Sequence, residues 1–265
     1  MNPKSYSHPE SICKVYKNSK CSRCIEDEEF RFGYTPGDVY ILGLFSIHQD
    51  GSSPNNDDEV FKCGDFRTGT TAIITVSAFL ESVKSVRSKL GINFGAIALD
   101  DCYNELNISA VITELFTRQR VLYEPNTSKA IDFSKVVTVV GALSSRVTLI
   151  VADVMSSLHI PMVSYGASAK SLDDRIRYPY FLRTVPSDAL QIEGMVKVIS
   201  NLNFEYVGAL YIDDAYGTSG IQGLISQANS KGICVTEPKS ITEDSTEQYM
   251  KYILREYYIK QGEYI

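Results

Sequence analysis

The chain has 265 residues, of which 44% are hydrophobic and 22% charged, and its formal net charge is -6 at pH 7. This length suits one large α/β domain or two smaller lobes, since domains commonly run to about 100–200 residues. The acidic balance lacks the Lys and Arg clusters that neutralise phosphates, which argues against DNA or RNA as a partner. No apolar run approaches the roughly 20 residues of a transmembrane helix. The first residues also lack the apolar stretch of a secretory signal, so we expect either a cytosolic protein or a sequence that is incomplete at its front.

Cysteine usage favours an oxidising compartment. The six cysteines are Cys13, Cys21, Cys24, Cys63, Cys102 and Cys234. No second Cys-x-x-Cys follows Cys21 and Cys24, so the sequence lacks the four-ligand motif of a zinc ribbon. Disulfides are the better interpretation, and a zinc or redox role for that pair is the alternative. Two glycosylation sequons, at Asn107 and Asn126, are compatible with a secreted glycoprotein.

The first lobe is predicted from an alternation of apolar runs and amphipathic stretches. Residues 1–36 are polar and show no sustained periodicity, which predicts an irregular N-terminal extension that contains cysteines. Val39–Phe45 is then a continuous apolar run, typical of a strand buried on both faces of a parallel sheet. We expect strands at 39–45, 94–99, 136–141 and 162–165, and helices at 68–90, 105–121 and 144–158. This order predicts an α/β lobe with a doubly wound parallel sheet over residues 37–187.

A second lobe is predicted over residues 188–265, where the alternation starts afresh. We expect helices at 188–202, 217–231 and 245–257, and strands at 206–212 and 233–235. Because two strands can hardly close a core of their own, the sequence predicts that this lobe is incomplete within the chain.

Ligands of open α/β sheets bind beyond the carboxyl ends of strands, where helix N-termini offer backbone N–H groups to anions. One such turn runs from Gly141 into Ser144 and Ser145, whose hydroxyls and helix dipole suit a carboxylate. A simple helix N-cap is the alternative. The turn after the fourth strand contains Gly166 and Ser168, small residues that let a ligand approach the backbone. An ordinary loop is the alternative there.

A third turn, 213–217, also lies between a strand and a helix. Asp213 and Asp214 suit an ammonium group or a divalent ion, and Tyr216 could stack on a cation. A solvated turn with an N-cap is the alternative.

Local signatures of catalysis are missing. The sequence contains no G-x-S-x-G, no Walker A loop, no G-x-G-x-x-G after the first strand and no H-E-x-x-H. The three histidines, His8, His48 and His159, form no nucleophile–base pair by local spacing, although a spatial pair stays open. We therefore expect a protein that is not an enzyme.

Six motifs together resemble those of class C G-protein-coupled receptors, in the same order. They lie at residues 37–48, 63–64, 141–152, 160–165, 180–188 and 216–220. The match covers roughly residues 37 to 235 and is to the ectodomain of metabotropic glutamate and calcium-sensing receptors. The resemblance implies a bilobed, periplasmic-binding-protein-like fold of type I, the Venus flytrap.

The resemblance also implies a site. In that family an α-amino acid docks on the first lobe, the second lobe closes over it, and closure rearranges a dimer that drives the membrane helices. By residue-to-residue match, Ser145 would hold the α-carboxylate through its hydroxyl and backbone N–H. Ser168 and the backbone at Gly166 would bind the carboxylate and the amino group. Asp188 would pair with the ammonium, and Tyr216 would cover the ligand from the second lobe.

Further residues match structural features of the family. Cys63 and Cys102 match a disulfide of the first lobe, and Cys234 matches a cysteine that pairs with a cysteine-rich domain beyond this chain. The helix at 145–158 resembles one that packs across the dimer, so Val154 and Leu158 are candidate interface residues, with burial in their own lobe as the alternative. The resemblance implies a homodimer or heterodimer through the first lobe. It also implies a heterotrimeric G protein, engaged through a transmembrane region absent from this chain, and a location on the extracellular side of the plasma membrane.

One departure bears on the ligand. Glutamate-selective members hold the distal carboxylate with a basic residue where this chain has Ile74, and Thr70 replaces an aromatic residue nearby. A second buried carboxylate without that cation would be costly, so we expect a small amino acid other than glutamate. No cofactor is implied, although Ca²⁺ near Asp213 and Asp214 is a candidate modulator. The other hypotheses are a soluble amino-acid-binding protein, a ligand-free dimer scaffold, and a hydrolase or transferase on the same architecture.

Overall fold

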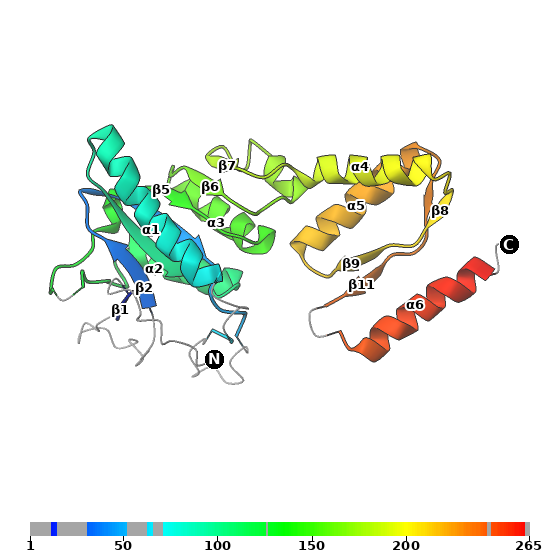
Figure 1. The fold of residues 1–265 in the computed structure, drawn as a ribbon, viewed down its shortest axis with the longest axis horizontal. Helices are drawn as coiled ribbons and strands as arrows, with labels where there is room; N and C mark the ends of the chain where they lie inside the picture. The colour runs from blue at the N-terminus through cyan, green and yellow to red at the C-terminus, as the bar shows by residue number, and fades with distance from the viewer. Residues whose placement is uncertain are drawn as a thin grey trace, which may run out of the picture. The chain divides into compact units, whose positions relative to one another are not determined.

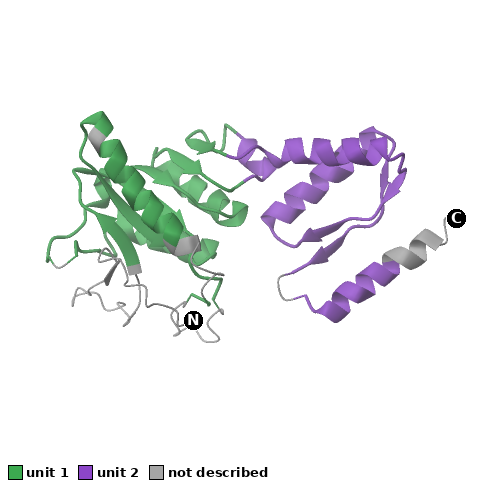
Figure 2. Cartoon of the chain, in the orientation of Figure 1, with its two compact units in different colours: residues 1–167, 175–184 green, residues 168–174, 185–265 purple. Residues whose placement is uncertain are grey.

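The computed structural model describes residues 12–14, 31–51, 63–65, 71–125, 127–242 and 245–262. The chain divides into two compact units, which Figure 2 colours separately. Unit 1 consists of Met1–Ala167 and Arg175–Thr184, and unit 2 consists of Ser168–Asp174 and Val185–Ile265.

Unit 1 is built on a seven-stranded sheet with the order β1-β2-β4-β3-β5-β6-β7. The strands are β1 (Ile12–Lys14), β2 (Arg31–Thr35), β3 (Val39–Phe45), β4 (Phe94–Asp100), β5 (Val136–Val140), β6 (Met162–Ser164) and β7 (Phe181–Arg183). Neighbouring strands from β4 to β7 are parallel, which confirms the predicted doubly wound sheet. Because β3 lies between β4 and β5, the strand order reverses there. The loops after β3 and β5 therefore flank the crevice where such sheets bind ligands.

The helices of unit 1 bury the apolar stripes that their sequences predict. They are α1 (Thr71–Leu90), α2 (Glu105–Phe116) and α3 (Ser145–Ser157), with a short 3-10 helix, η1, at Phe133–Lys135. Figure 1 shows α1 running across the strands, and there Leu80 and Val83 pack with Phe45. In α3, Val147 and Val151 are fully buried. In the part of the chain that the structure describes, no helix combines the length and apolarity needed to cross a bilayer.

Unit 1 also differs from the sequence prediction. Residues 1–36 were expected to be irregular, but Arg31–Thr35 forms β2, which pairs antiparallel with β4. The helix expected to reach residue 121 ends at Phe116, where the Thr117 hydroxyl bonds back to the Thr113 carbonyl and Arg118 takes a positive φ of 61°. β7 was missed because it has only three residues.

Unit 2 combines helices with short strands. Its helices are α4 (Asp188–Asn201), α5 (Ala215–Ser230) and α6 (Glu247–Gly262), with a 3-10 helix, η2, at Lys170–Asp173. Ile192 and Val196 of α4 join Ile221 and Leu224 of α5 in its core.

The strands of unit 2 form two parallel pairs rather than one ladder. β8 (Tyr206–Val207) pairs with β10 (Cys234–Val235), and β9 (Leu210–Ile212) pairs with β11 (Lys239–Ile241). The single strand expected at 206–212 is thus split, and β11 was not expected. Pro238 lies between β10 and β11, and its missing N–H cannot donate to a continuous ladder.

Candidate ligand-binding site

The β5–α3 turn separates the roles of two adjacent serines. Ser144 is the N-cap of α3, and its hydroxyl accepts a hydrogen bond from the Val147 N–H at 3.2 Å. Ser145 is the first helical residue and is 4% exposed. The N-cap alternative therefore applies to Ser144, and Ser145 lies at the positive end of the helix dipole, where an anion is favoured.

The turn after β6 is organised by Ser164, a fully buried residue that the sequence reasoning missed. Its hydroxyl donates to the Ala142 carbonyl at 2.8 Å and accepts from the N–H groups of Gly166 and Ala167 at 3.2 and 2.9 Å. At Gly166, a Cβ would lie 2.7 Å from the Leu143 carbonyl oxygen. The Gly166 backbone therefore lies against the turn that leads into Ser145, as the neighbouring positions of β5 and β6 allow.

Arg146, next to Ser145, ties the first turn of α3 to two other loops. Its guanidinium forms ion pairs with Glu105 at 3.0 Å and with Asp50 at 3.2 Å. It also donates to the Tyr103 carbonyl and lies 5.2 Å from the centre of the Tyr103 ring. An Arg directly after two serines gave no sign of this network, because its partners are 41 to 96 residues away in the chain.

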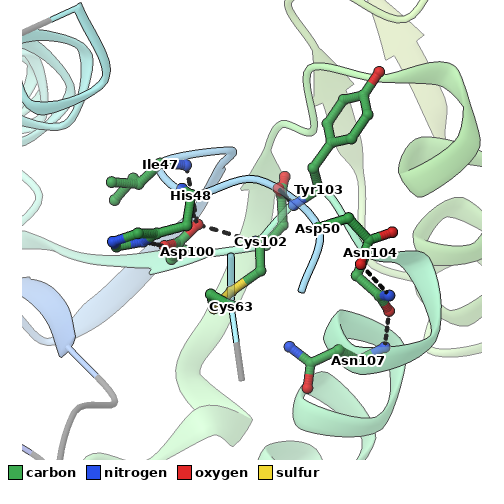
Figure 3. Close-up of a disulfide and its surroundings, with 10 residues drawn as sticks. Ile47, His48, Asp50, Cys63, Asp100, Cys102, Tyr103, Asn104 and Asn107 are labelled. Atoms are coloured by element: carbon green, nitrogen blue, oxygen red, sulfur yellow. Dashed lines mark hydrogen bonds and ion pairs between the residues drawn. A yellow bond between two sulfur atoms is a disulfide. The ribbon is translucent and has the colours of Figure 1, made fainter. Parts of the chain in front are cut away.

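The expected disulfide between Cys63 and Cys102 is present. It joins Cys63, in the described segment 63–65, to Cys102, the second residue after the end of β4 (Figure 3). Beside it, one carboxylate oxygen of Asp100 accepts from the N–H groups of Ile47, His48 and Cys102 at 2.9, 3.3 and 2.9 Å. The other oxygen contacts the His48 ring, which Figure 3 shows alongside the carboxylate.

Three of the five candidate residues belong to unit 2. The Asp188 N–H donates to the Ser168 carbonyl at 2.8 Å, and Asp188 is 7% exposed in the first turn of α4. Tyr216 lies in the first turn of α5, which Asp214 caps by accepting from the Gly217 N–H at 2.7 Å. Burial raises the pKa of the Tyr216 phenol, and the carboxylates of Asp188 and Asp214 raise it further. Unit 2 thus brings Ser168, Asp188 and Tyr216 into one neighbourhood, while Ser145 and Gly166 belong to unit 1.

The remaining predicted residues have varied settings. Asn107 is half-buried in the first turn of α2, and Asn126 lies outside the described residues. Cys234 is exposed, and within the described residues it has no disulfide partner. In α3, Val154 is half-buried and Leu158, its C-cap, is exposed.

Comparison with known proteins places this chain in a family. Residues 76–258 match the family described as "Receptor family ligand binding region". The chain therefore belongs to this family, whose periplasmic-binding-protein-like α/β fold agrees with the parallel sheet of unit 1.

The relatives narrow the class to the ligand-binding domains of class C G-protein-coupled receptors. The chain is 27% identical over 234 residues to the metabotropic glutamate receptor of Drosophila melanogaster, covering 83% of this chain and 23% of that protein. It is 27% identical over 233 residues to the human G-protein coupled receptor family C group 6 member A, with 84% and 25% covered. For metabotropic glutamate receptor 4 of Rattus norvegicus the identity is 29% over 234 residues, with 83% and 25% covered. The chain spans about a quarter of the length of these relatives.

Proposed function

We propose that the chain is the extracellular ligand-binding region of a receptor that takes a small α-amino acid between its two lobes. The observation that carries this proposal is the start of α3. Ser145 is buried at a helix N-terminus, Ser144 already serves as the N-cap, and the Gly166 backbone lies against the same turn. Such a turn supplies a hydroxyl and backbone N–H groups for one carboxylate. Ser145 would bind the α-carboxylate through its hydroxyl and backbone N–H. The backbone at Gly166 would bind the carboxylate and the amino group.

The second lobe would supply the ammonium partner. Asp188 provides a buried carboxylate, and Tyr216 provides an aromatic ring. In addition to burial, that carboxylate raises the pKa of the Tyr216 phenol. A ligand ammonium would form an ion pair with Asp188 and stack on the ring of Tyr216. Ser168, beside Asp188, would bind the same end of the ligand. Closure of the second lobe over the first would then bury the ligand. This is binding chemistry, in keeping with the receptor names of the relatives.

The ligand we favour carries one carboxylate. Ile74 of α1 stands where glutamate-selective receptors of the resembled family have a cation, and its side chain is apolar and 60% exposed. A distal carboxylate would lack a partner at that position. Ca²⁺ could assist near the exposed Asp213, whereas Asp214 is engaged in capping α5.

In the longer receptor, ligand-driven closure would rearrange a homodimer or heterodimer through the first lobe and activate a heterotrimeric G protein. Val154 and the exposed Leu158 are the residues that we assign to the dimer contact. The region would lie outside the plasma membrane, with Asn107 and Asn126 as glycosylation sites. Cys234 would bond to a cysteine-rich domain.

A thermal-shift measurement tests this proposal. The secreted chain is heated with each of the twenty amino acids, with and without Ca²⁺. A ligand that binds only the folded state stabilises it, by about 2.7 kcal/mol at a hundredfold excess over Kd. We expect a shift with small neutral amino acids and none with glutamate, and loss of the shift in Ser145→Ala.

Ser157→Ala is the matched control, because Ser157 is an exposed serine at the opposite end of the same helix. It should keep the full shift. Absence of a shift with every amino acid would contradict the proposal and favour a ligand-free dimer scaffold.

A further inference from the structure

Three metal-ligating side chains meet beside the disulfide of unit 1. Ligand atoms of His48, Cys63 and Asp100 all lie within 4.8 Å of one another, and Figure 3 shows them together. Among the described residues no other group of three or more His, Cys, Asp and Glu side chains is this close. Imidazole, thiolate and carboxylate are the three ligand types that Zn²⁺ takes in proteins, with about 2.0–2.3 Å from metal to ligand atom.

In the oxidised chain Cys63 cannot act as a thiolate, because its sulfur is bonded to Cys102. The two cysteines differ in exposure, since Cys63 is exposed whereas Cys102 is 3% exposed. Thiol–disulfide exchange requires direct attack on a sulfur atom, and we expect that attack at the more exposed residue, Cys63.

Hydrogen bonds to backbone groups restrain the three ligand residues in addition to the disulfide. The Gly64 N–H donates to the Gln49 carbonyl at 3.0 Å, and the Gln49 N–H donates to the Asp65 carbonyl at 2.8 Å. These two backbone bonds hold Cys63 next to the loop that carries His48. Asp100 is fixed by its three backbone N–H donors. Reduction would thus leave the three side chains close together.

We propose that reduction of the Cys63–Cys102 disulfide opens a binding site for a divalent transition metal ion, Zn²⁺ being the best match. A dithiol reductant supplies two electrons and two protons to the disulfide and is itself oxidised to a cyclic disulfide. Zn²⁺ then binds as the Cys63 thiol loses its proton to solvent. Neutral His48 and the Asp100 carboxylate complete three protein ligands, and water takes the fourth position, as in open zinc sites. A disulfide oxidant, which takes two electrons from Cys63 and Cys102 and two protons (one from the Cys102 thiol, one from solvent) and is reduced to two thiols, re-forms the bond; this removes the Cys63 ligand and releases the metal.

Two single variants that both lack the disulfide test this proposal. Cys102→Ser leaves Cys63 as a free thiol and should bind metal without any reductant, whereas Cys63→Ser removes a ligand. Both are made in a chain in which Cys13, Cys21, Cys24 and Cys234 are Ser, so that the Cys-x-x-Cys pair cannot compete. Co²⁺ is the probe, because thiolate ligation gives a charge-transfer absorption band. We expect that band in Cys102→Ser only, with affinity higher than in Cys63→Ser by at least about tenfold, the loss that even outer-shell changes bring.

His48→Gln keeps the disulfide and removes a different ligand of the same site. The parent chain here is the one with the four Cys→Ser changes, which keeps Cys63 and Cys102. After reduction and removal of the reductant, this parent chain should bind Co²⁺ or Zn²⁺, and His48→Gln in the same chain should bind the metal at least about tenfold more weakly. Far-UV circular dichroism verifies that each reduced chain is still folded. Equal affinity of Cys102→Ser and Cys63→Ser, or a folded reduced parent chain that binds no metal, would overturn the proposal.

Discussion

In unit 1, the side chains of Leu42, Leu44 and Leu99 are completely buried, whereas in unit 2 Tyr206, Leu210 and Ile212 are 61%, 38% and 44% exposed. All six belong to strands of similar apolar character. The strands β3 and β4 are enclosed because neighbouring strands and helices cover them, while β8 and β9 each have one paired neighbour among the described residues. Strand burial therefore depends on what packs around the strand, and an apolar run by itself specifies only the strand. The stability of the two units should differ accordingly.

The largest expected effect is loss of the Cys63–Cys102 disulfide, which lies in unit 1 and spans 39 residues. The double variant Cys63→Ser/Cys102→Ser should lower the free energy of unfolding of unit 1 by about 4 kcal/mol, because the unfolded chain gains entropy. Amide hydrogen exchange, followed separately in the peptides of each unit, measures this loss. Cys234→Ser should leave both units unchanged, and an equal loss in unit 2 would contradict the separation of the two units.

A core truncation should affect unit 1 more than an equivalent truncation affects unit 2. Leu42→Ala removes a fully buried side chain of β3 and should cost about 3 kcal/mol, since the surrounding core collapses only partly. Leu210→Ala, on β9, should cost less than about 1 kcal/mol because much of that side chain already meets water. The measurement is again unit-resolved hydrogen exchange. Similar costs at the two positions would show that unit 2 is better enclosed than its exposed strands indicate.

Removing Arg146 should have an intermediate effect. Arg146→Ala leaves the carboxylates of Asp50 and Glu105 without their shared cation in a partly buried setting, and should cost about 2 kcal/mol in unit 1. Lys84→Ala, which breaks the exposed pair with Glu81, should cost less than about 0.5 kcal/mol. Arg146→Lys should restore only part of the loss, because an ammonium cannot reproduce the planar fork. A thermal or denaturant titration of the three variants would contradict this ranking if Arg146→Ala behaved like Lys84→Ala.

The smallest effect concerns the titration of Tyr216 in unit 2. Its pKa is raised by burial and by the Asp188 and Asp214 carboxylates, so Asp188→Asn should lower it. The folded-state pKa lies above that of the unfolded chain, so this contribution to stability is fully present below about pH 10 and is lost as the pH rises through the folded pKa. Carbon-13 NMR of labelled tyrosines, assigned with Tyr216→Phe, measures the shift. An unchanged Tyr216 titration in Asp188→Asn would show that the two side chains do not share one neighbourhood.

Local pattern was enough to predict the elements that bury most apolar surface. The run at β3 and the stripe of α3 were both predicted within two residues, because each period is a direct consequence of backbone geometry. The Ser145 and Gly166 turns followed from the rule that parallel sheets present ligands at the carboxyl ends of strands. By contrast, the split of the strand at 206–212 depends on which residues of β10 and β11 it meets, and those lie beyond the strand's own sequence.

The sequence by itself thus determined the α/β class, the parallel sheet of unit 1, the Cys63–Cys102 pairing through its family resemblance, and which turns carry the candidate ligand residues. The tertiary structure alone decided that Ser145 is buried, that Ser164 orders the turn at Gly166, and that Arg146 pairs with Asp50 and Glu105. It also decided that His48 and Asp100 lie beside Cys63. The physical reason is range: periodicity and capping act over a few residues, whereas ion pairs and metal-ligating clusters join side chains that only the packed sheet brings together.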